Sequence, residues 1–367
     1  MDRRVFFTAA GGAATAALGA TTLATPALAQ SNPEIRWRMP SSFPRNLDVL
    51  FGSCERLSRR VAELTDGRFR ITPFPAGEIV PALQVLDSVQ AGSIECGHTP
   101  ALFYFGKEPA LAFFTCVPFG MNRRQMAAWM RYGDGQKLAD ELFSGFNSIF
   151  LNFGDTGTQM GGWFRREMRT MEDVRSLKFR IAGLGGLVFE RMGATPTQIA
   201  PGDIYPALER GVIDAAEFIG PYDDEKLGLN RIARFYYSPG FWEPCSMGGF
   251  IANKQAWERL PAHYRTAVEV ALGEIDTDQN ARFDAWNPPA LRRLIAGGAQ
   301  LRAWPREIMQ VAWREAHGLY DDLSARSPAF KKVWDNYRVF RNEQYQWFRL
   351  ADNAFDNFAF TMAAQSG

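Results

Sequence analysis

The alternation of apolar and polar positions predicts a βαβ unit near the start of the folded chain. Residues 35–39 and 68–74 alternate as strands do. Residues 48–64, between them, carry apolar side chains at helical spacing, with Asp48 as a plausible N-cap. Strands joined by such a crossover run parallel in one sheet. The sequence therefore predicts an α/β fold.

The same two periodicities continue along the chain. Up to residue 153 they predict a helix over 80–90, a strand over 94–98, a long helix over 123–146 and a buried strand over 148–153. Beyond it they predict a strand over 178–181, a loop over 183–186, helices over 187–192 and 206–210, strands over 212–218 and 248–252, and a helix from 257 to beyond 279. We expect the strand over 248–252 to return the chain to the first group of elements.

The last segment predicts one long helix. Ser327 and Pro328 form a good helix start, and residues 329–365 contain neither glycine nor proline. The aromatic side chains of this helix are spread too widely for one buried stripe. Two interpretations stay open: a brace that lies across both halves of the molecule, or a contact with a second subunit in a homodimer.

The first 29 residues have the pattern of an export signal. Asp2-Arg3-Arg4-Val5-Phe6-Phe7 is a twin-arginine start, and Ala27-Leu28-Ala29 is a small-residue cleavage site. The apolar stretch between them is rich in Ala, Gly and Thr and falls short of the roughly 20 apolar residues that a membrane span needs. We expect cleavage before Gln30 and a mature protein in the periplasm.

Length, charge and cysteine content narrow the class of protein. The chain beyond the signal exceeds one ordinary core, which favours two lobes. A net charge of +1 with interspersed signs argues against nucleic acid as a partner. The four cysteines lie far apart without a Cys-x-x-Cys pair, so a disulfide in the periplasm stays open.

Four polar residues in the middle of the chain carry the candidate chemistry. Gln159, Arg180, Glu217 and Glu243 each stand close to glycine, proline or aromatic residues. A guanidinium can hold a carboxylate through two parallel hydrogen bonds. Glutamate and glutamine oxygens are hard ligands for a cation such as sodium or calcium. This set suits a small carboxylate bound together with a metal ion.

The segments around these residues resemble the solute receptors of tripartite ATP-independent periplasmic (TRAP) transporters, most closely the branch that binds 2-oxo acids. The motifs are Gly154-Asp155-Thr156-Gly157-Thr158-Gln159, Leu177-Lys178-Phe179-Arg180, Ile213-Asp214-Ala215-Ala216-Glu217-Phe218 and Pro239-Gly240-Phe241-Trp242-Glu243. The resemblance implies a two-lobed periplasmic binding protein fold of type II-like architecture that closes on its solute by a hinge. The expected parts are the signal 1–29, lobe I over 30–153 with a return segment near 247–290, lobe II over 154–246, and a helical C-terminal region over 291–367 with its long helix from about 328.

The resemblance also implies a role for each site residue. Arg180 would hold the solute carboxylate. Glu217, Glu243, the carbonyl oxygen of Phe218 and the side chain of Gln159 would hold the metal ion, with the Gln159 amide near the solute. Many relatives have tryptophan where this chain has Phe218, which leaves the solute size open. His98, Phe103, Tyr104 and Phe105 fall in the loop after the strand over 94–98. The resemblance implies that one aromatic residue of this loop covers the solute, and Tyr104 is our choice among them.

The implied function is capture of pyruvate or a short-chain 2-oxo acid and its delivery to a membrane permease, without catalysis. Counting the two glutamates, the solute carboxylate and Arg180, calcium would neutralise the site and sodium would leave one negative charge. The resemblance favours sodium, so the ion stays open. The alternatives are a receptor for a 2-hydroxy acid such as lactate with calcium, and a periplasmic metal-dependent enzyme that acts on keto acids.

Overall fold

The computed structural model describes residues 32–366, so the predicted export signal lies outside the described residues. The chain divides into a short N-terminal unit that ends at Pro33 and a compact unit from Glu34 onward. None of its described helices combines the length and apolar character needed to cross a membrane.

The first strands form the predicted βαβ unit. Strands β1 (Ile35–Pro40) and β2 (Phe69–Phe74) run parallel, and helix α1 (Leu50–Leu64) connects them. The apolar side of α1 includes Leu57 and Val61, which are buried against the two strands. A single parallel bridge between Ser41 and His98 links this unit to the next sheet.

The second sheet has the order β3 (Cys96–His98), β10 (Met247–Asn253) and β4 (Ser148–Asp155). Strand β10 runs antiparallel to both neighbours. The chain therefore returns to this sheet after residue 246, as expected. The returning strand is antiparallel to its neighbours, whereas the strands of a βαβ unit are parallel. Residues from the two distant parts of the chain share one core here.

A third sheet has six short strands in the order β11-β9-β5-β8-β6-β7. They are β5 (Trp163–Phe164), β6 (Lys178–Arg180), β7 (Thr195–Thr197), β8 (Ala215–Ala216), β9 (Phe235–Ser238) and β11 (Gln300–Ala303). Strand β8 is shorter than the predicted strand over 212–218, so Glu217 and Phe218 follow the strand end. Strand β11 comes from the C-terminal region that we expected to be helical, and it pairs in parallel with β9.

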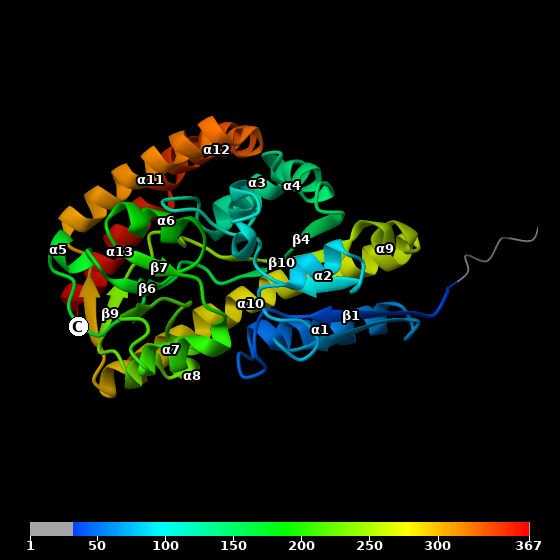
Figure 1. Ribbon diagram of the computed structural model, residues 1–367, viewed down its shortest axis with the longest axis horizontal. Helices are drawn as coiled ribbons and strands as arrows, with labels where there is room; N and C mark the ends of the chain where they lie inside the picture. Colours follow the sequence, from blue (N-terminus) through cyan, green and yellow to red (C-terminus); the bar gives the residue numbers. More distant parts are fainter. Residues whose placement is uncertain (1–31, 367) are drawn as a thin grey trace, which may run out of the picture. The chain divides into compact units, whose positions relative to one another are not determined.

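The remaining shorter helices mostly connect or cover these sheets (Figure 1). They are α2 (Val85–Gln90), α3 (Arg123–Tyr132), α4 (Gly135–Ser144), α5 (Met171–Val174), α6 (Gly183–Arg191), α7 (Ile204–Glu209), α8 (Pro221–Leu227) and α9 (Lys254–Arg259), with 3-10 turns η1 (Ala101–Tyr104), η2 (Pro109–Phe114), η3 (Pro201–Asp203) and η4 (Leu229–Arg231). The single helix predicted over 123–146 is two helices, because Asp134 adopts a left-handed conformation with φ of 66°. The predicted loop over 183–186 is the first turn of α6.

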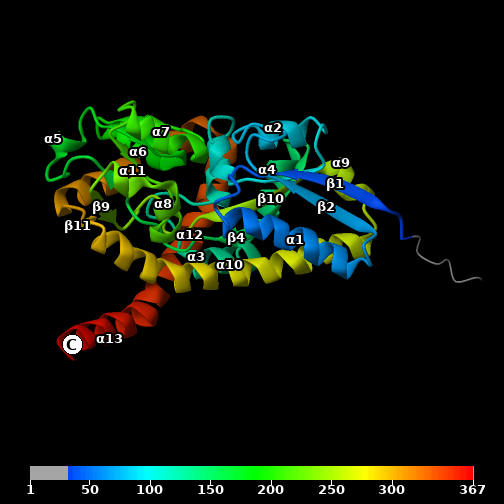
Figure 2. The ribbon, with the colours of Figure 1, turned by 90° about the horizontal axis from the view of Figure 1, so that it is seen from below.

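Helix α10 (Ala262–Ala296) is the longest helix among the described residues. It packs against β4 and α1 at one end and against α8 at the other, so one helix contacts elements associated with both groups of strands. Figure 2 shows it as a continuous helix along the lower side of the compact unit in this view. It passes through Pro288 and Pro289 without ending.

The C-terminal helices share their aromatic residues between core and solvent. Helix α11 (Arg306–Arg326) leads into α12 (Pro328–Leu350), which Ser327 caps by accepting a hydrogen bond from the Phe330 backbone N–H (3.0 Å). Phe330, Trp334 and Tyr337 pack around Phe113 with ring centroids 5.0 to 6.0 Å apart. The first part of this segment is therefore packed into the core.

The predicted long helix is interrupted. Ala351, with φ and ψ both at −92°, separates α12 from α13 (Asp352–Ser366). Figure 2 shows α13 pointing away from the rest of the ribbon. Phe355, Phe358 and Phe360 on it are each about 70% exposed (71%, 70% and 68%).

We predict that Phe330 stabilises the fold through α12. Replacing it with Ala removes a fully buried ring, which typically costs about 3–5 kcal/mol of unfolding free energy. Val339→Ala on the exposed side of the same helix is the control, with an expected change within about 0.5 kcal/mol. Urea unfolding measures both. Equal unfolding free energies for the two variants would contradict the packing of α12 described above.

Candidate functional site

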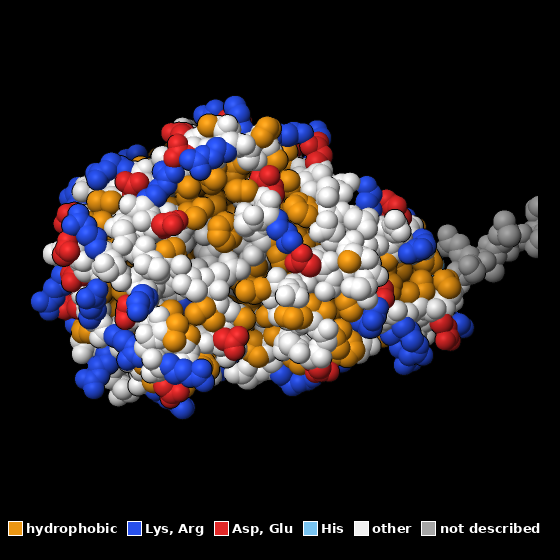
Figure 3. Space-filling model, viewed as in Figure 1, with side chains coloured by type: hydrophobic (Ala, Val, Ile, Leu, Met, Phe, Trp, Pro, Cys, Tyr) orange, Lys and Arg blue, Asp and Glu red, His pale blue; other side chains and the backbone are white. Residues whose placement is uncertain are grey.

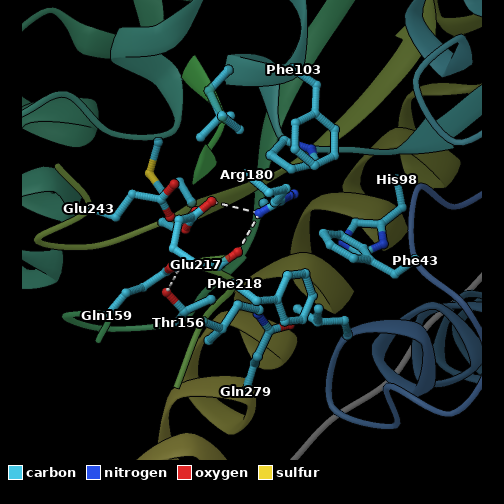
Figure 4. A pocket seen from close by; sticks show the side chains of 18 residues that line it. Phe43, His98, Phe103, Thr156, Gln159, Arg180, Glu217, Phe218, Glu243 and Gln279 are labelled. Carbon is cyan, nitrogen blue, oxygen red and sulfur yellow. Dashed lines mark hydrogen bonds and ion pairs between the residues drawn. The ribbon is translucent and has the colours of Figure 1, made fainter. Parts of the chain in front are cut away.

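The candidate site is a small cavity between the sheet that contains β3 and the sheet that contains β6. Its volume of about 40 Å³ exceeds the ~10–15 Å³ that one water needs, so it accommodates a molecule of a few heavy atoms. The apolar part of its wall includes Phe43, Leu50, Leu102, Phe103, Phe218, Ile219 and Met247. The polar part includes His98, Thr156, Gln159, Arg180, Glu217, Glu243, Ser246 and Gln279. Figure 4 shows Glu243 and Gln159 on one side of this cavity and His98 and Phe43 on the other.

Arg180 and Glu217 meet because they leave neighbouring parallel strands at the same edge. Arg180 pairs with Ala216 across β6 and β8, and the Glu217 backbone N–H donates to the Arg180 carbonyl (3.1 Å). The carboxyl ends of parallel strands bring such side chains together. Arg180 Nη1 lies 2.6 Å from Glu217 Oε1, with the two side chains only 2% and 1% exposed.

The Arg180 guanidinium is largely engaged by the protein. Its Nε donates to the Ile199 carbonyl (3.1 Å), and Nη1 donates to both the carbonyl and Oε1 of Glu217 (2.6 Å each). Nη2 makes no hydrogen bond with any described residue. We expected Arg180 to offer two parallel hydrogen bonds to a solute carboxylate; in this arrangement only Nη2 is free for that purpose.

Gln159 and Glu243 come together through backbone hydrogen bonds between their segments. Gln159 N–H donates to the Glu243 carbonyl (3.1 Å), and Gly240 N–H donates to the Gln159 carbonyl (2.8 Å). Gly185, in the first turn of α6, leaves room for the neighbouring Trp242, since a Cβ on it would lie 2.8 Å from the Trp242 Cβ. The glycines around these residues therefore permit close packing of backbone and side chains.

Burial raises the pKa of both glutamates. Glu217 loses its hydration, and the Arg180 charge offsets only part of the rise in its pKa. The pKa of Glu243 is well above its usual range because of burial and, next, the negative charge of Glu217. Two buried carboxylates with one cation between them leave excess negative charge, which a bound cation would relieve.

The oxygens at the site fit a metal ion. Gln159 Nε2 donates to Thr156 Oγ1 (3.1 Å), which leaves Gln159 Oε1 buried without a partner. Glu217 Oε2 is likewise buried without a partner. Within the described part of the chain no three His, Cys, Asp or Glu residues gather for a metal. An ion here would therefore depend on two carboxylates and on neutral oxygens, and Gln159 and the Phe218 carbonyl are the candidates for these.

The structure does not bring Tyr104 to the cavity, so the expectation that it covers the solute is not supported by the geometry. Its hydroxyl accepts from Leu86 N–H (3.1 Å) and is 3.0 Å from Thr99 Oγ1, and the side chain is 2% exposed. Phe103, one residue earlier in η1, lines the cavity instead. Consecutive residues of a 3-10 turn point in different directions, and the Tyr104 hydroxyl is satisfied inside the core.

Phe218 does line the cavity, with its ring centroid 5.9 Å from the Arg180 Cζ atom. Its neighbour across the cavity is Phe43, at 6.5 Å between ring centroids. These rings close the apolar side of the cavity.

Sequence reasoning missed Gln279, a buried residue in the middle of α10 that lines the cavity. Nothing in the surrounding helical pattern distinguishes it from a core position. The signal lies elsewhere, at Gly154, whose φ is +77° and where a Cβ would lie 2.6 Å from the Gln279 side chain. The glycine that starts the segment leading to Gln159 thus makes room for Gln279.

Comparison with known proteins gives consistent results. The model of bacterial extracellular solute-binding protein family 7 (DctP) matches residues 41–326. A monocarboxylate 2-oxoacid-binding periplasmic protein of Nostoc sp. is 46% identical over 358 residues, which span 97% of this chain and 98% of that protein.

Two solved structures show the same fold. A TRAP transporter solute-binding protein of Bordetella bronchiseptica, a mixed-occupancy dimer with calcium and picolinate in one active site, is 46% identical with a TM-score of 0.90, over 91% of this chain and 100% of that one. A TRAP periplasmic solute-binding protein of Pseudoalteromonas atlantica with sodium and pyruvate is 31% identical with a TM-score of 0.85, over 88% and 98%.

Charged side chains of both signs are interspersed on the face that Figure 3 shows.

These matches confirm the predicted two-lobed α/β fold and the predicted family. The family match covers most of the chain, and the likeness to the Nostoc and Bordetella proteins runs through nearly all of it. The chain belongs to family 7 of the bacterial extracellular solute-binding proteins, the periplasmic receptors of TRAP transporters.

Proposed function

We propose that this receptor binds a short 2-oxo monocarboxylate, such as pyruvate, together with a sodium or calcium ion, and delivers the solute to its membrane permease. The observation that carries the proposal is that one cavity is lined by Arg180, with a single free guanidinium nitrogen, and by Gln159 and Glu217, each with an unpartnered oxygen. The named ligands of the Nostoc, Bordetella and Pseudoalteromonas proteins support it.

The charge at the cavity favours one carboxylate on the solute. Among the described residues that line it, Arg180 alone carries a positive side chain. A second solute carboxylate would face Phe43, Phe103 and other apolar groups and would be buried unpaired, which is costly. The small volume adds to this preference for short monocarboxylates.

The ion would be held by Glu217, Glu243, the Phe218 carbonyl and Gln159 Oε1, with Gln159 Nε2 near the solute. When bound, it supplies the positive charge that the adjacent carboxylate and 2-oxo oxygens of the solute can share. The chain itself orients the solute through Arg180 and excludes water with its aromatic rings. Carboxylate oxygens are hard ligands that suit sodium and calcium alike.

We also propose that the protein is a receptor without catalytic activity, exported by the twin-arginine route. Asp2-Arg3-Arg4-Val5-Phe6-Phe7 supports the export route. We propose lobe I over 30–153 with the return segment near 247–290, and lobe II over 154–246. The shared sheet of β3, β4 and β10 supports this division.

Pyruvate and its short homologues are expected to bind with micromolar or better affinity, whereas acetate, succinate and amino acids are expected to bind far more weakly. Acetate lacks the second oxygen donor, and succinate brings the unpaired charge. Calorimetry in sodium and in calcium buffers measures this, with lactate included to test the 2-hydroxy acid alternative. Tight binding of succinate or an amino acid, without binding of any 2-oxo acid, would overturn the proposal, and loss of pyruvate from the mixture would reveal an enzyme.

Arg180 and Glu243 are expected to respond differently to substitution. Arg180→Ala leaves the solute carboxylate and Glu217 unpaired, a loss of about 2–5 kcal/mol, which is roughly 30-fold to several thousand-fold in solute affinity. Arg180→Lys should recover only part of it. Glu243→Gln should weaken the ion first, so that added metal restores solute affinity in this variant and not in the Arg180 variants.

The matched controls for these variants are Arg175→Ala and Glu172→Gln. These residues form an exposed ion pair outside the cavity, and both variants should bind as the unmodified protein does. Calorimetry at two metal concentrations measures the set, and circular dichroism checks folding. Equal rescue of both classes by metal, or near-native binding by folded Arg180→Ala, would show that the roles are assigned wrongly.

We propose that the mature protein is a homodimer whose contact includes α13. The three exposed phenylalanines of α13 and the dimer described for the Bordetella protein support this. Because α12 belongs to the core, the informative truncation follows Leu350. We expect a dimer for the full chain and a solute-binding monomer for the truncated one, by light scattering at micromolar concentration. A monomeric full-length protein would contradict it, whereas a truncated dimer would place the contact elsewhere.

A further inference from the structure

His98 is a cavity residue that the roles above leave unused. It ends β3, it is fully buried, and it lines the cavity. Phe153 and Phe43 hold its ring, at 4.3 and 5.3 Å between centroids. The ring is therefore fixed in orientation, and each of its two nitrogens has its own environment.

The environment of Nδ1 determines which nitrogen carries the proton. Ser41 Oγ lies 3.0 Å and Cys54 Sγ 3.1 Å from Nδ1. Ser41 Oγ already accepts from the Phe43 backbone N–H (3.1 Å), so its own hydrogen is available for Nδ1. Burial lowers the pKa of His98 to about 3, which makes the ring neutral at pH 7. Donation from the Ser41 hydroxyl to Nδ1 would leave the proton of the neutral ring on Nε2.

The Nε2–H group has no partner in the protein. It is buried and makes no hydrogen bond with any described residue. Gly248, also in the cavity wall, lies next to it: a Cβ there would lie 3.4 Å from Nε2, at ordinary van der Waals contact. A buried donor without an acceptor is costly, and such groups in native proteins generally meet a water or a ligand.

Arg180 can donate to only one of the two oxygens of a bound carboxylate in this arrangement. Only its Nη2 is free, because Nη1 is engaged by Glu217 and Nε by Ile199. A carboxylate has two oxygens, and the second requires another donor. Figure 4 shows Arg180 between the glutamate side of the cavity and His98 in this view.

We propose that His98 donates a hydrogen bond from Nε2 to the solute carboxylate oxygen that Arg180 leaves unpaired. This inference rests on the proposed function. Since His98 ends β3 and Arg180 ends β6, the carboxylate is held between two sheets. His98 is thereby a specificity-determining residue that joins solute binding to the closed arrangement of the cavity. Ser41 is a positioning residue that keeps the Nε2 proton in place.

Calorimetry with pyruvate tests the energetic part. A hydrogen bond to a charged group contributes enough that His98→Leu should bind about 10-fold to 100-fold more weakly. His98→Gln keeps an N–H donor and should recover part of the affinity. His317→Leu, a histidine of α11 outside the cavity wall, is the matched control and should bind normally.

Nuclear magnetic resonance tests the geometry without relying on the variants' stability. The chain has only three histidines, so long-range proton–nitrogen spectra can be assigned by comparison with the variants. We expect His98 in the Nε2–H form, and we expect its N–H proton to shift downfield when pyruvate is added. In Ser41→Ala the tautomer preference should weaken.

The outcomes separate this inference from the function on which it rests. If the unmodified protein binds no 2-oxo acid, the proposed function fails. If it binds pyruvate but folded His98→Leu binds equally well, or the His98 N–H resonance does not respond, then the function stands and the role of His98 is refuted. An Nδ1–H tautomer in the pyruvate complex would refute it as well.

Discussion

Arg180 and Glu217 form an ion pair that is almost completely removed from water. Each charge of such a pair needs the other to offset the loss of its hydration. A buried pair of this kind recovers its desolvation penalty only if further hydrogen bonds satisfy its remaining groups. The Arg180 guanidinium has such bonds, to the Ile199 and Glu217 carbonyls, whereas Glu217 Oε2 has none. The pair is therefore weak evidence for stability and stronger evidence for a site that a solute and an ion complete.

The surrounding fold can be understood as the means of holding this pair in place. Parallel register between β6 and β8 sets the two side chains next to each other, and the hydrogen-bonded segments of Gln159 and Glu243 bring the other oxygens to the same edge. The aromatic rings lower the local polarity, which strengthens each electrostatic interaction and raises the penalty for any unpaired group. Selectivity for the solute therefore follows from which polar groups of the cavity have no partner in the protein.

Much of this could be predicted from the sequence, because the motifs place each polar residue close to glycine, proline or aromatic residues. Gln159, Arg180, Phe218, Glu217 and Glu243 all line the predicted kind of cavity, although their roles stay predictions. Tyr104 could not be told from Phe103, since both are aromatic residues of one short turn. The engagement of Nη1 by Glu217 depends on strand register, which residue types do not reveal. No glycine or proline in the sequence indicates the break at Ala351.

Some contributions are visible only in three dimensions. Gln279 stands in a regular helix, and its importance emerges from the missing Cβ of Gly154 on another element. His98 was visible as the end of a strand, but the two polar groups at its Nδ1 come from segments 57 and 44 residues away. Long-range contacts of this kind decide the protonation of a side chain and leave no local pattern.

Helix α10 has a mechanical consequence for the entry of a solute. It contacts β4 and α1 near one end and α8 near the other, and it carries Gln279 into the cavity wall. Because one helix contacts both groups of elements, a movement of one group relative to the other would involve this helix. Pro288 and Pro289 each lack a backbone N–H donor, so the helix has its fewest ladder hydrogen bonds there. Bending at that step costs less than bending elsewhere in the helix, so a relative movement of the elements at its two ends would be easiest there.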